Sequence, residues 1–184
     1  MSRRLVVNFF GPTRSGKDAL LLLVRKRLDA RPVVTRTVSS IDAVKTFYRE
    51  AYLLARGELP LEISPADRQA LSSIKAALDT AVNWTVNLAM REVEAVPDRA
   101  VLLYQARELE NVTALRRACA ERGYGFLPVF LHRPGADGAD GADSDRYPPS
   151  AWQAAGVVVT NSGDLEDLGA WADLIVEKAL GLLR

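Results

Sequence analysis

Residues 8–23 read NFFGPTRSGKDALLLL and place a glycine-rich turn between an apolar run and a leucine-rich run. Gly11, Gly16 and Lys17 follow the spacing G-x-x-x-x-G-K, which is that of a Walker A phosphate-binding loop. The two glycines allow backbone angles and a close approach that a Cβ would obstruct. The N–H groups of residues 12–17, at the start of a helix, can surround an anion, and Lys17 can reach the terminal phosphates of a nucleotide. The alternative is a glycine-rich turn whose lysine is an ordinary surface charge.

Asp18 occupies the position that is normally Ser or Thr in such loops, where a hydroxyl binds the magnesium ion of the nucleotide. A carboxylate can hold Mg²⁺ directly or through water, because hard cations prefer oxygen ligands. In the absence of the metal, the same charge repels a triphosphate. In the alternative interpretation, Asp18 touches no ligand and only stabilises the N-terminal end of its helix.

The segments around this turn alternate between strand and helix patterns. Short apolar or β-rich runs at 4–10, 32–39, 100–104, 126–132 and 155–160 predict five strands. Helical patterns cover 17–30, 40–57, 106–123 and 164–183. The stretch from about 65 to 95 has no internal Pro or Gly, so it predicts one long helix or two helices with a kink near Asn83, with Ser64 as the N-cap. This alternation predicts an α/β fold with a parallel sheet covered on both faces.

Composition limits the classes of partner. A length of 184 residues suits a single domain, 1–184, and an apolar content of 48% is enough for a core. The net charge of +1 argues against a nucleic-acid partner bound through bulk positive charge, although a small anion is compatible with it. The apolar run near the N-terminus is too short for a signal peptide or a membrane span, so a cytoplasmic location without a membrane partner is expected.

The stretch GPTRSGKD, residues 11–18, resembles the loop of phage deoxynucleoside monophosphate kinases and, in its GxxxSGKD form, that of animal-type phosphomevalonate kinases. FLHRPG at 130–135 and GVVVTNSGDLEDL at 156–168 are similar to two further segments of the phage kinases. The resemblance implies a P-loop nucleoside or nucleotide kinase with a three-layer α/β/α fold and a five-stranded parallel sheet. It implies ATP and Mg²⁺ as cofactors and a small-molecule substrate, a (deoxy)nucleoside monophosphate in the first instance. A homodimer is a further expectation.

The resemblance also implies roles for individual residues. The middle of the chain, with SSIDAVK at 39–45, RQALSSIKAALD at 68–79 and LLYQARELENV at 102–112, resembles segments of uncharacterised bacterial proteins of the same kinase superfamily, which implies that the acceptor lies in the region 38–95. Residues 133–150 would occupy the position of a lid, with a plain linker as the alternative for this loop. Helix capping and solvated surface charge are the alternatives for the acceptor residues. ATP would be bound by Gly11, Pro12, Thr13, Arg14, Ser15, Gly16, Lys17, Asp18 and Ala19, with Asn161, Ser162 and Gly163 beside the base. The moving phosphoryl group would be contacted by Lys17, Arg107, Arg133 and Arg146. The acceptor would be bound by Ser39, Ser40, Asp42, Lys45 and Lys75.

One position departs from the phage kinases. Those enzymes carry Asp-x-Arg at the tip of the third strand, whereas residues 104–107 read YQAR here, with Gln105 in place of the carboxylate. The carboxylate on the magnesium side must then come from Asp18, or the active site is degraded. No general base is evident, which favours a phosphate acceptor over an alcohol. Two other hypotheses stay open: a P-loop regulator or NTPase that is not a kinase, and a kinase-like protein that binds nucleotide without catalysis.

Overall fold

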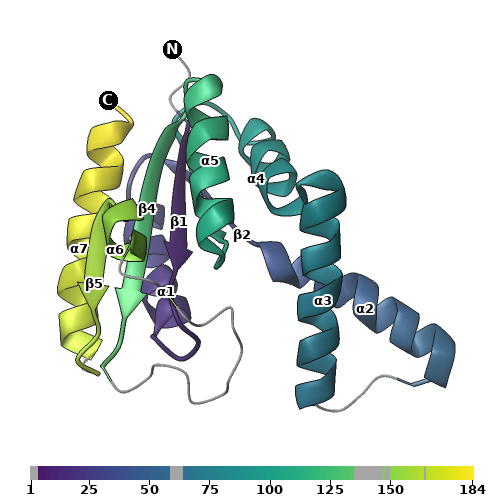
Figure 1. Ribbon diagram of the computed structural model, residues 1–184. Helices are drawn as coiled ribbons and strands as arrows, with labels where there is room; N and C mark the ends of the chain where they lie inside the picture. Colours follow the sequence, from purple (N-terminus) through teal and green to yellow (C-terminus); the bar gives the residue numbers. More distant parts are fainter. Residues whose placement is uncertain (1–3, 59–63, 135–146, 148–149, 164) are drawn as a thin grey trace.

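A five-stranded sheet of parallel strands forms the centre of the computed structural model, which describes residues 4–58, 64–134, 147, 150–163 and 165–184 (Figure 1). The strand order is β2-β3-β1-β4-β5. The strands are β1 (Leu5–Phe10), β2 (Val34–Ser39), β3 (Ala100–Gln105), β4 (Gly125–His132) and β5 (Val157–Thr160). The helices are α1 (Lys17–Asp29), α2 (Ser40–Arg56), α3 (Pro65–Val82), α4 (Trp84–Glu94), α5 (Leu109–Glu121), α6 (Ser150–Ala154) and α7 (Leu165–Leu182).

Helices cover both faces of the sheet. Every residue of β1 is buried, and because side chains alternate along a strand, its two faces pack against different helices. Val7 and Phe9 join the core formed with α1 and α7, whereas Val6 joins the core formed with α4 and α5. The predicted three-layer α/β/α fold and its five parallel strands are therefore confirmed.

The stretch 65–95 forms two helices, which decides between the two alternatives left open by its sequence. Asn83 lies between them in the left-handed region, with φ of 48°, and interrupts the helical path. Ser64 is the N-cap of α3, as predicted: its hydroxyl accepts a hydrogen bond from Asp67 N at 3.2 Å, and the Asp67 carboxylate accepts one from Ser64 N at 2.8 Å. Helix α6, five residues long, was not predicted.

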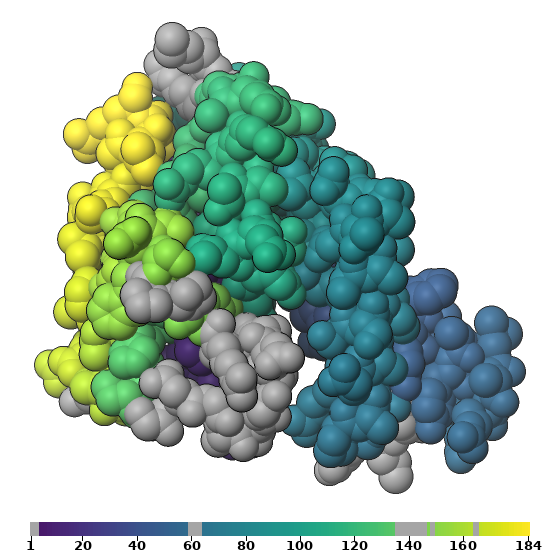
Figure 2. Space-filling view, viewed as in Figure 1, coloured from purple at the N-terminus to yellow at the C-terminus, as the bar shows by residue number. Residues whose placement is uncertain are grey.

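Helices α2 and α3 project beside the sheet on the side away from α7, and we call them the acceptor arm (Figures 1 and 2). Ser40 and Val44 are the buried residues of α2, and Leu54 is 90% exposed. The arm belongs to the predicted acceptor region 38–95, and the limits of that region stay a prediction, as does the single domain 1–184. None of the helices in the described ranges combines the length and the apolar composition needed to cross a membrane.

The order of the strands determines which chain segments meet. Because β1 lies between β3 and β4, the turn after β1 is flanked by the carboxyl ends of both neighbours. Phe9, one residue before the end of β1, is in register with Gln105 at the end of β3. In open α/β sheets, ligands bind at the carboxyl ends of the strands. The binding site lies where the chain connections from two adjacent strands run to opposite sides of the sheet.

Candidate functional site

The phosphate loop, residues 11–18, connects β1 to α1 and needs glycine at both ends of its turn. Gly11 has φ of 137°, and a Cβ there would lie 2.2 Å from the carbonyl oxygen of Leu131 in β4. Gly16 has φ of 96°, and a Cβ there would lie 2.4 Å from Asn161 Nδ2. Each contact is far shorter than a van der Waals distance, so a side chain at Gly11 would displace the backbone of β4, and one at Gly16 would displace the Asn161 amide.

The ammonium group of Lys17 lies within the loop. It donates hydrogen bonds to Gly11 O at 2.8 Å, to Pro12 O, and to Ser15 Oγ at 3.3 Å, and Lys17 is only 7% exposed. Phosphate oxygens are stronger acceptors for an ammonium than carbonyl or hydroxyl oxygens, because they carry a full negative charge. The loop therefore presents Lys17 where a terminal phosphate group would compete for it.

Asp18 and Gln105 contact each other, which the sequence did not predict. Gln105 Nε2 donates a hydrogen bond to Asp18 Oδ1 at 2.7 Å. The residue that replaces the expected carboxylate at the end of β3 therefore orients the only carboxylate of the phosphate loop. Asp18 is exposed at the first turn of α1, beside the two glycines of the loop.

A magnesium ion fits this donor set. Mg²⁺ in kinase sites is held by one or two carboxylates together with phosphate oxygens and water, so a single Asp18 carboxylate is sufficient. The described residues contain no cluster of three or more His, Cys, Asp or Glu side chains that could hold a metal ion by itself.

Arg107 and Tyr147 join the start of the phosphate loop. Arg107 Nη1 donates to Thr13 Oγ1 at 3.3 Å. The Tyr147 hydroxyl donates to Arg107 O at 2.7 Å and accepts from Gly11 N at 3.3 Å. Its ring packs at 5.3 Å from that of Phe130. Sequence reasoning missed Tyr147, although it is the only aromatic residue in the Gly- and Asp-rich stretch 134–149.

The turn after β5 lies against the other side of the phosphate loop. Asn161 is 4% exposed, and its Nδ2 donates to Ser15 O at 2.8 Å. Ser162 and Gly163, predicted beside the base, are exposed. Arg133 approaches the same turn, because its Nη2 would lie 3.6 Å from a Cβ at Gly163. Arg146 lies outside the described residues. Arg14 is exposed, with φ of 62°, and Ala19 is partly buried in the first turn of α1.

Four of the predicted acceptor residues, those in β2 and α2, divide into two groups. Ser39 and Ser40 lie beside the end of β3: Ser39 is in register with Gln105, and Ser40 Oγ donates to Gln105 O at 3.0 Å. Asp42 and Lys45 instead pair with each other at 2.8 Å on the surface of α2. The structure thus brings the two serines toward the phosphate loop, and the acceptor contacts themselves stay predictions.

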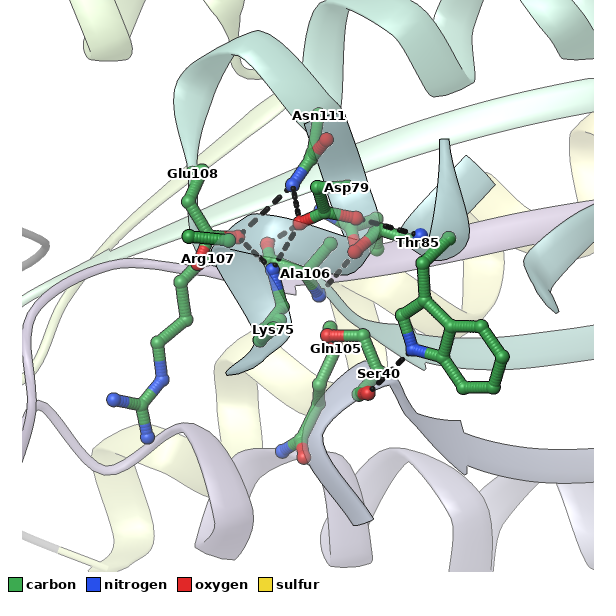
Figure 3. A network of polar contacts seen from close by, with 12 residues as sticks. Ser40, Lys75, Asp79, Thr85, Gln105, Ala106, Arg107, Glu108 and Asn111 are labelled. Atoms are coloured by element: carbon green, nitrogen blue, oxygen red, sulfur yellow. Dashed lines mark hydrogen bonds and ion pairs between the residues drawn. The ribbon is translucent and has the colours of Figure 1, made fainter. Parts of the chain in front are cut away.

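Lys75 is the centre of a network of polar contacts between helices (Figure 3). Its side chain is 7% exposed, and Nζ contacts Asp79 Oδ2 at 2.8 Å and Glu108 Oε2 at 2.7 Å. Asn111 Nδ2 donates to the same two carboxylate oxygens, each at 3.1 Å. Thr85 N donates to Asp79 Oδ1 at 2.8 Å. The network joins α3 to the first turns of α4 and α5, whereas the Arg107 side chain points away from it.

The two carboxylates of this network are ionised at neutral pH. Burial raises the pKa of Asp79, but hydrogen bonds from Lys75 and Thr85 outweigh that effect and lower it below its ordinary value. Burial likewise raises the pKa of Glu108, and the hydrogen bond and charge of Lys75 reverse the shift. The predicted contact of Lys75 with the acceptor stays a prediction. Its spacing from Asp79, four residues along a helix, is the one signal of this network visible in sequence.

Comparisons with known proteins concern the fold. The sequence matches no protein-family model and no curated protein. Among solved structures, it resembles the Mycobacterium tuberculosis APS kinase CysC in complex with AMPPNP and APS, with a TM-score of 0.59 and 17% identity over 98% of this chain and 99% of that one. It also resembles a hexameric APS kinase from Thiobacillus denitrificans, with a TM-score of 0.58 and 16% identity over 100% of this chain and 30% of that one. The chain therefore has the α/β fold of the P-loop kinases, and the finer likeness to phage kinases stays a prediction.

Proposed function

We propose that this protein is a kinase that transfers the γ-phosphoryl group of ATP to a small-molecule acceptor. The observation that carries the proposal is the convergence of Lys17, Asp18 and Arg107 on one glycine-rich loop at the carboxyl ends of β1 and β3. The shared fold with an APS kinase that binds AMPPNP and APS supports it.

The chemistry required of the protein is mainly positioning and charge neutralisation. The backbone N–H groups of the phosphate loop and Lys17 would hold the phosphates of ATP. Arg107, held beside the loop by Thr13, would stabilise charge on the moving phosphoryl group. Asp18, oriented by Gln105, would hold Mg²⁺. When bound, the metal ion neutralises the oxygens of the β- and γ-phosphates.

For the acceptor we propose a phosphorylated small molecule, with a (deoxy)nucleoside monophosphate as the first choice. Three carboxylates on the acceptor side have cationic partners, since Asp42 pairs with Lys45, and Asp79 and Glu108 pair with Lys75. A fourth, Asp67, accepts hydrogen bonds from Ser64 and Tyr48 at the start of α3. An alcohol acceptor needs a base to take its proton, whereas a phosphate oxyanion attacks without one. The serines beside Gln105 fit the role of hydrogen-bond donors to such an acceptor.

A panel of acceptors tests this function. The purified protein is mixed with ATP, Mg²⁺ and each ribo- or deoxynucleoside monophosphate, or with APS, and ADP release is followed. We expect acceptor-dependent ADP release for at least one nucleoside monophosphate, reduced by about 10²-fold or more in Lys17→Ala. Release with APS alone would replace the proposed acceptor. ATP binding without any acceptor-dependent release would instead favour the second candidate, a nucleotide-binding protein without catalysis, which Gln105 at the expected carboxylate position supports.

The role of Asp18 has its own test. Asp18→Asn keeps a side chain of the same size but removes the negative charge, so we expect a higher Mg²⁺ concentration for half-maximal ADP release. Asp29→Asn is the matched control, because Asp29 lies at the far end of the same helix and pairs there with Arg25 at 3.5 Å. An unchanged Mg²⁺ dependence in Asp18→Asn would remove Asp18 from the metal site.

A further inference from the structure

The geometry points to Asn161 as a positioning residue of the phosphate loop. We propose that its amide fixes the peptide between Ser15 and Gly16, so that the Gly16 N–H faces the bound phosphates. This inference rests on the proposed nucleotide site and assigns to Asn161 a role different from the base contact that its sequence resemblance implies.

Both ends of the Asn161 side chain are engaged. Nδ2 donates to Ser15 O at 2.8 Å, and Oδ1 accepts from Gly163 N at 2.9 Å. The backbone N–H of Asn161 donates to His132 O at 2.8 Å, which fixes the residue to the end of β4. Rotating the amide by half a turn would set oxygen against oxygen and N–H against N–H, so the donor has to face Ser15.

The contact with Ser15 determines the direction of a second group. A trans peptide is planar, and its C=O and N–H point in opposite directions; no cis peptide occurs in the described chain. When Asn161 holds the Ser15 carbonyl on the β5 side of the loop, the Gly16 N–H must point away from β5. That is the direction in which a donor can contribute to an anion site at the start of α1.

Glycine makes this restraint necessary. The peptide before Gly16 can rotate readily, because Gly16 has no Cβ to restrict its backbone. A half-turn of that peptide would replace the N–H with the Ser15 carbonyl, whose negative end repels phosphate. The same glycine makes the restraint possible, since Asn161 Nδ2 occupies the space of the missing Cβ, 2.4 Å from its position. Gly16 and Asn161 thus depend on each other.

The two roles for Asn161 predict different losses of ligand affinity when its side chain is removed. A residue that contacts the base affects only ligands that have a base, and its loss changes the preference between bases. A residue that orients a loop N–H affects every ligand with a polyphosphate chain by the same factor. Burial of Asn161 to 4% exposure, with both polar ends of the side chain occupied, favours the second role.

Titration calorimetry with ATP, GTP and tripolyphosphate, each with Mg²⁺, tests the proposal on the whole chain. We expect Asn161→Ala to weaken the binding of all three ligands by one common factor of about 10 to 100. This factor corresponds to the loss of one hydrogen bond to a charged group. Asn87→Ala is the matched control, because Asn87 Nδ2 also donates to a backbone carbonyl, Val82 O at 2.7 Å, but on α4. Circular dichroism confirms that each variant is folded, and Asn161→Asp, which puts an acceptor against Ser15 O, should weaken binding further.

Each other outcome overturns the proposal in an identifiable way. If Asn161→Ala weakens ATP but not tripolyphosphate, or changes the ratio of ATP to GTP affinity, Asn161 is a base contact. If the variant binds all three ligands as tightly as the wild type, the inference fails while the nucleotide site stands. If the wild type binds neither ATP nor tripolyphosphate, the proposed function fails and the inference fails with it.

Discussion

At the scale of single residues, the shape of the phosphate loop depends on contacts from outside it. Gln105 at the end of β3 holds Asp18, and Asn161 after β5 holds Ser15 O. Tyr147 donates to Arg107 O and accepts from Gly11 N, so one hydroxyl joins two parts of the site. A loop with glycine at both ends has little intrinsic preference for one conformation, and these side chains supply it.

The Tyr147 hydroxyl offers a prediction at this scale. Tyr147→Phe keeps the ring against Phe130 but removes the hydrogen bonds to the backbone of Gly11 and Arg107. We expect the free energy of unfolding to fall by about 1 kcal/mol, measured by urea denaturation. Because the Arg107 backbone loses its support, kcat should fall while KM for the acceptor changes little.

The control for this prediction is Tyr124→Phe, at the opposite end of the sheet, where the tyrosine ring lies 5.9 Å from the guanidinium carbon of Arg4. It should leave kcat unchanged. Equal kinetics and stability for Tyr147→Phe and the wild type would show that the hydroxyl does not support the site.

At the scale of elements, the network around Lys75 attaches the acceptor arm to the first turns of α4 and α5. Lys75 and Asp79 come from α3, Glu108 precedes α5, and Thr85 belongs to the first turn of α4. A buried ion pair contributes little net stability compared with apolar residues, but breaking one by removing a single partner is costly. The network therefore sets the position of α3 more than it adds to the stability of the core.

Lys75→Met should change both the size and the sign of the pH dependence of the free energy of unfolding. In the wild type, the pKa values of Asp79 and Glu108 are lowered from ordinary values of 3.8 and 4.5, so their contribution to stability is present above those values and is lost as pH falls through the lowered ones. Without the Lys75 ammonium, burial raises both pKa values. The free energy of unfolding of the variant should be about 3 kcal/mol lower than that of the wild type at neutral pH. Part of this difference should be recovered as pH is lowered toward about 5.

Urea unfolding at neutral and mildly acidic pH measures this effect. Lys45→Met is the matched control, since the exposed pair of Lys45 and Asp42 at 2.8 Å should contribute less than about 1 kcal/mol at any pH. A Lys75→Met variant whose free energy of unfolding is the same or lower at mildly acidic pH than at neutral pH would contradict the account of the network.

At the scale of the whole molecule, the nucleotide should stabilise the complete fold, because the phosphate loop joins β1 to α1 in the core. A ligand that binds only the native state adds about 2.7 kcal/mol at 100 times its Kd. For a chain of 184 residues this corresponds to a rise in Tm of about 5 to 10 °C. Differential scanning fluorimetry with ATP and Mg²⁺ should show this rise. Lys17→Ala should abolish it, and an equal rise in that variant would exclude Lys17 from the phosphate site.

The parts of the molecule that sequence could predict are those with local signals. The strands, the glycine loop and the N-cap at Ser64 each depend on residues a few positions apart. Helix α6 was missed because its five residues, which follow two prolines, are too few to show the helical periodicity of apolar residues. The contacts of Asn161 with Ser15 and of Gln105 with Asp18 join residues 146 and 87 positions apart. Such contacts depend on the order of the strands in the sheet, which the spacing of apolar residues does not specify.

The base of the acceptor arm has a consequence for how this protein could be altered. Trp84 Nε1 donates to Ser40 O at 3.2 Å. The first residue of α2 and the first residue of α4 therefore lie side by side, and the arm begins and ends at the same place. Between these residues, Val44 and Leu71 are the buried apolar side chains of α2 and α3. Residues 41–83 can therefore be treated as an exchangeable insert. Under the proposed function, a foreign helical hairpin grafted there, with partners for Glu108 retained, would change the acceptor and leave the proposed nucleotide site unaltered.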